Sequence, residues 1–351
     1  MDIATLEKYD SQKMYKIYDK WPKISEDSYF SNMPKINLKK CSHIIFGGMG
    51  GSGTIGDVFF SILSKTNTHV TVVKGYNLPK TVNSDSLVVI TSMSGNTTET
   101  ISLLKNAKKI GAQIIAFSDG GKIRDICIKN NIEHRNIVKY HSPRASFTSV
   151  LYLMLGVLKP ILPIKELDIL ESLKKLKEMS KKINSNNISS SNPSLEISEW
   201  LNNFPIIYYP FGLQSAAIRF KNAIQENAKT HAIIEDVIES SHNGIVGWDR
   251  ESSFQPILLR GSEDVKTTKE RWKIIKEFFE LKNIEYKEII SEDGNILTKI
   301  ICLIYLFDYS SIFFAVKLKI DPSPVVAIDF IKKRLNYKIQ RKESNNINHI
   351  K

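Results

Sequence analysis

The chain has 351 residues, of which 42% are hydrophobic and 25% charged, and Lys and Arg outnumber Asp and Glu by 49 to 37. This length exceeds one ordinary domain and the apolar fraction supports packed cores, so a mostly disordered chain is excluded and two domains are expected. Cys41, Cys127 and Cys302 are odd in number and far apart. This spacing favours neither a disulfide framework nor a cysteine metal site.

The net charge of +12 would suit nucleic-acid binding, because basic domains attract phosphate backbones. Half of this excess lies in residues 332–351, where seven basic residues stand against one acidic residue, and the rest is spread among acidic residues along helices. No zinc-ligand spacing or helix-turn-helix signature accompanies it. We therefore expect a lysine-rich solvated surface and no nucleic-acid partner, with a basic nucleic-acid-binding protein as a rival hypothesis.

Neither a signal peptide nor a membrane span is expected. The first eight residues include Asp2, Glu7 and Lys8 and lack a signal-peptide apolar core. The longest apolar run, at 150–158, has nine residues, whereas a bilayer span needs about 20. These features predict a soluble, cytoplasmic protein with no membrane partner.

In chain order, residues 5–20 predict an amphipathic helix that ends at Trp21-Pro22. Short runs of apolar and β-branched residues then alternate with helical stretches, which is typical of a parallel, doubly wound sheet. The expected strands are 43–46, 69–73, 86–91, 113–117 and 136–139, followed by a buried helix at 146–158.

A charged helix at 165–182 and a polar linker at 183–193 connect this half to a second α/β half. There the expected strands are 205–209, 255–260 and 284–290, and the expected helices are 213–228, 265–282, 296–318 and a last one after Asp321-Pro322 that ends near 335. We therefore predict an α/β fold of two doubly wound parallel-sheet domains, divided as 1–164, a connection at 165–194, 195–335, and a frayed basic tail at 336–351.

Six of the 17 glycines fall between residues 47 and 56, directly after the first expected strand. Three of them match the dinucleotide spacing GxGxxG, in which glycines let backbone N–H groups approach an anion. A dinucleotide site also needs an acidic residue where the next strand ends, and that strand ends in Lys74. Ser52, a hydroxyl donor inside the turn, suits a small phosphate better. A turn that merely packs helix on strand is the alternative.

A second polar loop follows the third expected strand. Asn96 and Glu99 have capping-box spacing, but capping leaves the hydroxyls of Ser92, Ser94 and Thr97 unexplained. In a parallel sheet both loops emerge at the carboxyl ends of strands, where ligands bind. Together they predict a phosphate pocket built from neutral donors.

The pair of motifs, Gly-Gly-Ser-Gly at 50–53 and Ser-x-Ser-Gly-Asn-Thr at 92–97, resembles the sugar isomerase (SIS) domain, a flavodoxin-like phosphosugar-binding fold. More narrowly, the chain resembles the bifunctional phosphoglucose/phosphomannose isomerases, mostly archaeal, which contain two such domains. The segments that carry this closer resemblance are Pro143-Arg144-Ala145, Glu-Asn-Ala-Lys at 226–229, His-Asn-Gly-Ile-Val-Gly-Trp at 242–248 and Asp-Pro-Ser-Pro at 321–324 with Ile-Asp-Phe-Ile-Lys at 328–332.

The resemblance implies a role for each matched position. Glu226 would be the base that moves a proton between C1 and C2, and Arg144 would lie near the cis-enediolate. His242 and Lys332 would assist ring opening and closing. The residues implied to bind the sugar phosphate are Gly51, Ser52, Ser92, Ser94 and Thr97.

It also implies that the protein interconverts glucose 6-phosphate and mannose 6-phosphate with fructose 6-phosphate, without a metal or redox cofactor. The family's histidine reaches the site from the other subunit, so a homodimer is expected. The alternative is a non-catalytic phosphosugar sensor, which would need the serines but neither Glu226 nor His242. Lys333 adjoins Lys332, so either could be the ring-opening lysine. Met93 stands where the family often has an aromatic residue, and the segment before His242 lacks the usual proline.

Overall fold

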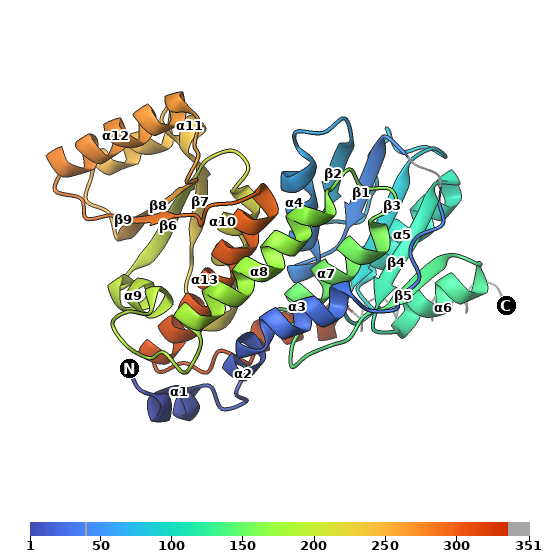
Figure 1. Ribbon diagram of the computed structural model, residues 1–351, viewed down its shortest axis with the longest axis horizontal. Coiled ribbons are helices and arrows are strands. Elements are labelled where there is room, and N and C mark those ends of the chain that lie inside the picture. The colour runs from blue at the N-terminus through green and yellow to red at the C-terminus, as the bar shows by residue number, and fades with distance from the viewer. Residues whose placement is uncertain (39–40, 336–351) are drawn as a thin grey trace.

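A computed structural model describes residues 1–38 and 41–335, which form two parallel sheets joined by helices (Figure 1). The first sheet has the order β2-β1-β3-β4-β5 and consists of β1 (His43–Gly47), β2 (His69–Val73), β3 (Leu87–Ser92), β4 (Gln113–Ser118) and β5 (Glu133–Asn136). The second has the order β7-β6-β8-β9 and consists of β6 (Phe204–Tyr209), β7 (Ile233–Asp236), β8 (Phe254–Arg260) and β9 (Lys287–Ile290). All neighbouring strands are parallel, so the expected α/β class with two parallel sheets is confirmed.

Helices cover both sheets, which is why the central strands are mostly apolar and buried. Every residue of β3 is buried. The helices of the first half are α4 (Gly51–Leu63), α5 (Thr98–Ile110), α6 (Gly121–Lys129) and α7 (Phe147–Leu158). Those that follow are α8 (Glu166–Ile183), α9 (Pro193–Trp200), α10 (Gln214–Ala223), the π-helix η1 (Ile224–Ala228), α11 (Val237–Ser240), the 3-10 helix η2 (Gly244–Asp249), α12 (Lys266–Leu281) and α13 (Ile296–Lys317).

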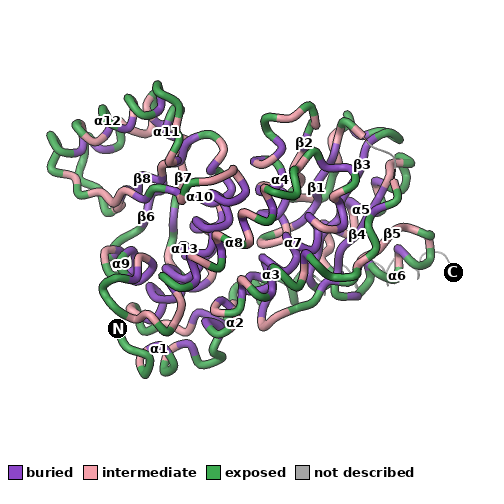
Figure 2. Tube along the Cα trace, viewed as in Figure 1, coloured by how far each residue is buried: buried purple, intermediate pink, exposed green. Residues whose placement is uncertain are grey.

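Helix α13 is the core of the molecule. Its positions 297–316 are all buried, as Figure 2 shows, and it packs against helices from both halves, including α4, α8, α9 and α10. The Tyr305 hydroxyl donates to the Tyr18 carbonyl oxygen over 2.7 Å, which ties the N-terminal segment to it. By length and composition α13 could cross a membrane, but 94% of its most apolar stretch is buried inside the fold, as in the core helix of a soluble protein.

The N-terminal segment forms three short helices, so the single helix expected at 5–20 is wrong. They are α1 (Ile3–Tyr9), α2 (Tyr15–Asp19) and α3 (Trp21–Tyr29). The buried Asp10 carboxylate accepts from the backbone N–H groups of Met14 and Tyr15, over 3.0 and 2.8 Å, which interrupts the first helix. Trp21-Pro22 begins α3 instead of ending a helix, because proline is compatible with a first turn whose N–H groups lack helical partners.

The fifth strand was expected at 136–139 and lies at Glu133–Asn136. It is an edge strand of half-buried polar residues, so it lacks the apolar run by which buried strands are predicted; Ile137, which misled the prediction, is buried just beyond its end. The short edge strand β7 and the helices α9 and α11 were not predicted.

The polar segment at 184–192 is packed against the fold. The buried Asn192 side chain caps α9 by accepting from the N–H groups of Ser194 and Leu195, and its amide donates to the Ile183 carbonyl over 3.2 Å. The hydroxyl of Ser185 donates to Asp19 over 2.7 Å. The segment is therefore a docked turn, the domain boundaries on either side stay predictions, and the tail at 336–351 lies outside the described residues.

The loops that follow β3 and β4 interlock through a glycine. Gly95 has a φ of 64°, and a Cβ there would collide with the carbonyl oxygen of Gly120. Across the same junction the Asn96 side-chain oxygen accepts from the Lys122 N–H over 3.1 Å. Only glycine permits both this backbone conformation and this close approach.

We therefore expect Gly95→Ala to lower the free energy of unfolding by about 2–4 kcal/mol, through left-handed strain and the collision with Gly120. Urea unfolding measures this change. Gly75→Ala is the matched control, because a Cβ at position 75 has no neighbour within 4 Å and its φ is not positive. Equal effects of the two substitutions would contradict the prediction.

Candidate active site

A cleft of about 690 Å³ lies where the first half meets the second. The turn after β1 supplies one wall, and the end of α10 with the π-helix η1 supplies the other. Its lining residues are Gly50, Asn222, Gln225, Glu226, Lys229 and residues 324–328. Of the four predicted catalytic residues, Glu226 alone is among these lining residues. Gly50 is adjacent in sequence to Gly51 and Ser52, which were predicted to bind phosphate.

Glu226 lies in η1, a π-helical turn that continues α10 and ends at Lys229, whose φ is 56°. Such turns are rare and frequently occur at functional sites, because they displace a side chain from the regular helical face. The Glu226 side chain is 27% exposed and faces the cleft. The carboxylate is therefore accessible to a ligand while its backbone is held in a packed element.

Arg144 is brought against Glu226 and held there. Its Nη1 lies 3.4 Å from the Glu226 Oε2, and its side chain is 5% exposed. Nε donates to the Asn227 Oδ1 over 2.7 Å, and Nη2 donates to the carbonyl oxygens of Pro322 and Ser323 over 2.6 and 2.9 Å. Four contacts orient this guanidinium, so a fixed cation lies against the carboxylate that lines the cleft.

A buried ion pair supports Arg144 from below. Arg219 of α10 donates through Nε to Asp308 of α13 over 2.9 Å, and its Nη2 donates to the Arg144 carbonyl oxygen over 2.8 Å. Burial disfavours the charged form of Arg219, yet the adjacent Asp308 raises the pKa of its guanidinium. On the same face of α13, Ser311 accepts from the Asn227 amide over 2.8 Å. The core helix thereby sets the position of both catalytic candidates.

Lys229 adds a second cation at this point. Its Nζ donates to the carbonyl oxygens of Glu226 and Asn227, over 2.6 and 3.2 Å, and to that of Pro322 over 3.1 Å. Although the residue as a whole is exposed, burial of its ammonium end, with the charge of Arg144, lowers its pKa to about 8. A lysine in the wall of a cleft whose pKa is lowered by burial and by a neighbouring cation is a candidate functional residue.

The predicted phosphate residues lie at the carboxyl ends of two paired strands. Gly51 and Ser52 form the first turn of α4 after β1, where helical N–H groups favour an anion. The hydroxyls of Ser92 and Thr97 lie 3.0 Å apart after β3, and the Ser94 hydroxyl accepts from the Asn96 N–H over 3.2 Å. Both loops therefore emerge at one sheet edge, as β1 and β3 are neighbours.

The capping box considered for Asn96 and Glu99 is wrong. The N-cap of α5 is Thr97, which makes no side-chain capping bond, and Asn96 is used by the neighbouring loop. The Glu99 carboxylate accepts from Thr98 and Tyr76. The hydroxyls of this loop are therefore not committed to capping the helix.

His242 and Lys332 lie apart from this group. His242 is exposed between α11 and η2, and Lys332 is exposed on a helix over residues 326–335 whose first turn lines the cleft. Within the described residues, neither side chain makes a hydrogen bond or ion pair. The chain thus brings Arg144, Glu226 and the β1 turn together and leaves His242 and Lys332 outside.

Asn227, Lys229, Arg219 and Asp308 were not predicted as part of the site. Asn227 and Lys229 stand in the quoted motif beside Glu226, which was the one signal available for them. Arg219 and Asp308 are 89 residues apart and carry no local signal. A buried pair of this kind becomes visible only when α10 and α13 pack together.

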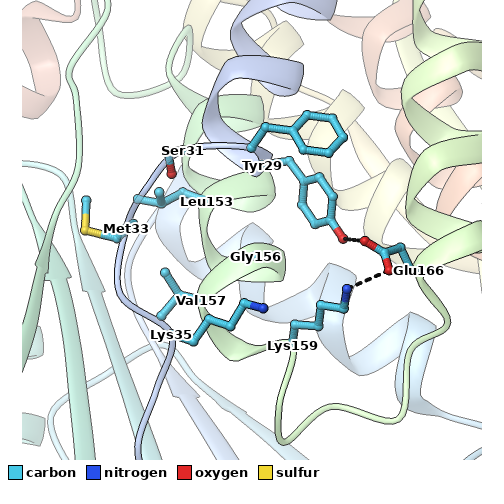
Figure 3. Close-up of a pocket in the computed structure, with 10 residues that line it drawn as sticks. Tyr29, Ser31, Met33, Lys35, Leu153, Gly156, Val157, Lys159 and Glu166 are labelled. Carbon is cyan, nitrogen blue, oxygen red and sulfur yellow. Dashed lines mark hydrogen bonds and ion pairs between the residues drawn. The ribbon is translucent and has the colours of Figure 1, made fainter.

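A second cavity lies away from the cleft, between α3, α7 and the start of α8 (Figure 3). It encloses about 180 Å³, and Glu166 there accepts from the Tyr29 hydroxyl and pairs with Lys159 over 2.8 Å. None of the predicted site residues lines it.

The chain matches two family models and several curated proteins. The model of the SIS domain matches residues 37–157, and that of the bacterial phospho-glucose isomerase C-terminal SIS domain matches residues 190–335. A bifunctional phosphoglucose/phosphomannose isomerase of Caldicellulosiruptor bescii is 32% identical over 314 residues, which is 86% of this chain and 91% of that protein. One of Aquifex aeolicus is 29% identical over 338 residues, 92% of this chain and 98% of that protein.

Solved structures show the same fold. A hypothetical protein of Thermus thermophilus superposes with a TM-score of 0.70 at 11% identity, over 96% of this chain and 90% of that chain. A tagatose-6-phosphate ketose/aldose isomerase of Escherichia coli superposes with a TM-score of 0.64 at 15% identity, over 90% of this chain and 96% of that chain. At these identities the likeness concerns the fold alone.

The lowered pKa of Lys229 predicts a pH-dependent difference between wild type and Lys229→Met. Between about pH 8 and the ordinary lysine pKa near 10.5, the unfolded state binds more protons at this residue than the folded state does. The stability contributed by Lys229 therefore rises with pH across this window. Urea unfolding of both proteins from pH 7 to 10 should show the free energy of unfolding of wild type rising relative to that of the variant. A difference that stays constant with pH would contradict the prediction.

Proposed function

Because this chain belongs to the bifunctional phosphoglucose/phosphomannose isomerase family, we propose that it interconverts glucose 6-phosphate and mannose 6-phosphate with fructose 6-phosphate. The observation that carries the proposal is the contact between the Arg144 guanidinium and the Glu226 carboxylate in a cleft shared with the β1 turn. Family membership makes the protein an enzyme. The chemistry of its site supports the finer assignment.

Glu226 is the proton-transfer base. Aldose–ketose isomerisation needs one carboxylate that lifts a proton from one carbon and returns it to the neighbour. C2 becomes planar in the enediolate, so one base serves both the glucose and the mannose epimer. Arg144 lies on the same side of the cleft, where it stabilises negative charge that develops on the enediolate oxygens.

The two loops at the edge of the first sheet hold the phosphate. The N-terminus of α4 supplies the Gly51 N–H and the Ser52 hydroxyl, and the end of β3 with the loop after it supplies the hydroxyls of Ser92, Ser94 and Thr97. Neutral donors suit a dianionic group that must also be released. This arrangement leaves the sugar carbons to reach toward Glu226.

A second subunit completes the site. His242 is exposed in the turn between α11 and η2, where a partner can reach it, and Lys332 lies on a helix with exposed apolar residues, among them Phe330 and Ile331. We assign both residues to ring opening and closing, with His242 donated across the interface of a homodimer. The division into a first domain at 1–164 and a second at 195–335 belongs to the same proposal.

Glu226→Gln tests the mechanism. Loss of the base should lower kcat for both aldose phosphates by about 10²–10⁴-fold and abolish solvent-tritium exchange into substrate, because an amide cannot carry the proton. A coupled assay with EDTA present measures turnover. Glu251→Gln is the control, since Glu251 is exposed and lies outside the cleft. Near-wild-type activity of Glu226→Gln would sink the mechanism.

Mixing two inactive variants tests the shared site. If His242 acts across a dimer interface, subunits of Glu226→Gln and His242→Asn that are refolded together form some mixed dimers with one intact site. Random pairing should restore about a quarter of wild-type activity. Each variant refolded alone stays inactive, and a mixture that gains nothing while forming mixed dimers would refute the shared site.

A further inference from the structure

One nitrogen of the Arg219 guanidinium has no hydrogen-bond acceptor among the described residues. The residue is 2% exposed, and Nε and Nη2 are taken by Asp308 and by the Arg144 carbonyl oxygen. The ring of Phe147 lies under the guanidinium, 4.7 Å from its central carbon. Within residues 1–38 and 41–335, however, no hydrogen-bond acceptor contacts Nη1. Nη1 is not among the fully enclosed polar atoms that lack a partner in these residues, so it remains available to donate to a ligand atom.

Nη1 faces the turn that follows β1. A Cβ built on Gly51 would lie 3.5 Å from Nη1, and its next neighbour would be the Pro143 carbonyl oxygen at 3.9 Å. The space that a side chain at position 51 would take is therefore bounded by a donor on one side and is otherwise uncrowded. Glycine keeps this space open without needing it for conformation, since its φ is not positive.

This space adjoins the cleft. Gly50, the preceding residue, lines the cleft together with Glu226. Arg144, whose backbone Arg219 holds, contacts Glu226 directly. A ligand oxygen placed beside Gly51 would thus lie between the N-terminus of α4 and the catalytic pair.

Resting on the function proposed above, we propose that Arg219 binds substrate directly: its Nη1 donates to a negatively charged oxygen of the sugar phosphate that occupies the space beside Gly51. Asp308 balances the charge of the guanidinium and fixes its plane, so Nη1 is a preorganised donor that needs no rearrangement on binding. Two oxygens have this chemistry, one on the phosphate and one on the enediolate.

The experiment compares ligand affinity in two variants. One removes the proposed contact of Nη1 with the ligand, and the other weakens only the ion pair with Asp308. Arg219→Lys keeps a cation for Asp308 but withdraws Nη1, whereas Asp308→Asn weakens the same pair and leaves Nη1 in place. We expect Arg219→Lys to weaken ligand binding at least about 10-fold. Asp308→Asn should weaken binding much less, even if it lowers thermal stability by the same amount. Calorimetry measures both, with wild type as reference.

Two probes identify the oxygen. Inorganic phosphate reports on the phosphate end, and a five-carbon sugar-acid phosphate, whose carboxylate resembles the enediolate, reports on both ends. Weaker binding of both probes by Arg219→Lys assigns Nη1 to the phosphate; weaker binding of the sugar acid alone assigns it to the enediolate. Because neither probe turns over, the outcome stands apart from the isomerase assay, whose failure would count against the proposed function only.

Gly51→Ala decides the matter if Arg219→Lys does not fold. Its methyl group would make only ordinary contacts, at 3.5 Å or more, so the protein should remain stable while the methyl occupies the space intended for the ligand oxygen. We expect affinity to fall about 10-fold. Where Arg219→Lys does fold, the losses from Gly51→Ala and Arg219→Lys should be less than additive in a double-mutant cycle. Unchanged affinity in Gly51→Ala, or equal losses in Arg219→Lys and Asp308→Asn, would overturn the assignment.

Discussion

The buried pair of Arg219 and Asp308 is the interaction on which the site depends. It joins α10 to α13, and through the Arg144 carbonyl it joins both helices to the loop that carries the catalytic arginine. A charge at this depth is tolerated only when it is paired and its hydrogen-bonding groups are used. The pair is therefore a constraint on geometry more than a source of stability, because it requires α10, α13 and the Arg144 loop to meet in one arrangement.

Each half of the chain contributes part of the candidate site, and neither half contains all of it. The first sheet contributes an anion-binding edge, where the turn after β1 and the loop after β3 emerge side by side. The second half contributes Glu226, raised on a π-helical turn that the regular α10 could not provide. Helix α13 joins the two halves. Its residues are buried, as Figure 2 shows, and its Ser311 and Asp308 bond to Asn227 and Arg219. The predicted phosphate-binding residues and the proposed base thereby lie on different elements, which lets each group be built from the residues suited to it.

Much of the fold could be predicted because it rests on local patterns. The strands β1 to β4, β6 and β8 are apolar runs bounded by polar turns, and α7 is a continuous apolar helix, so hydrophobic periodicity located them closely. The failures have a common cause. β5 and β7 are edge strands without a continuous apolar run, and the break after α1 depends on the Asp10 carboxylate turning back to two N–H groups. In each case a tertiary or side-chain contact decided against the local pattern.

The sequence alone determined the fold class and the family, and it predicted a phosphate site at the loops after β1 and β3, because glycine and hydroxyl residues at fixed spacing after strands are typical of anion-binding turns. Only the tertiary structure decided which charges act together. Arg144 contacts Glu226 across 82 residues and Arg219 contacts Asp308 across 89, separations at which no pattern along the chain marks a pair. It also decided that His242 and Lys332 lie outside the cleft of their own subunit. Contacts between charges depend on how helices pack, and packing is a property of the whole chain.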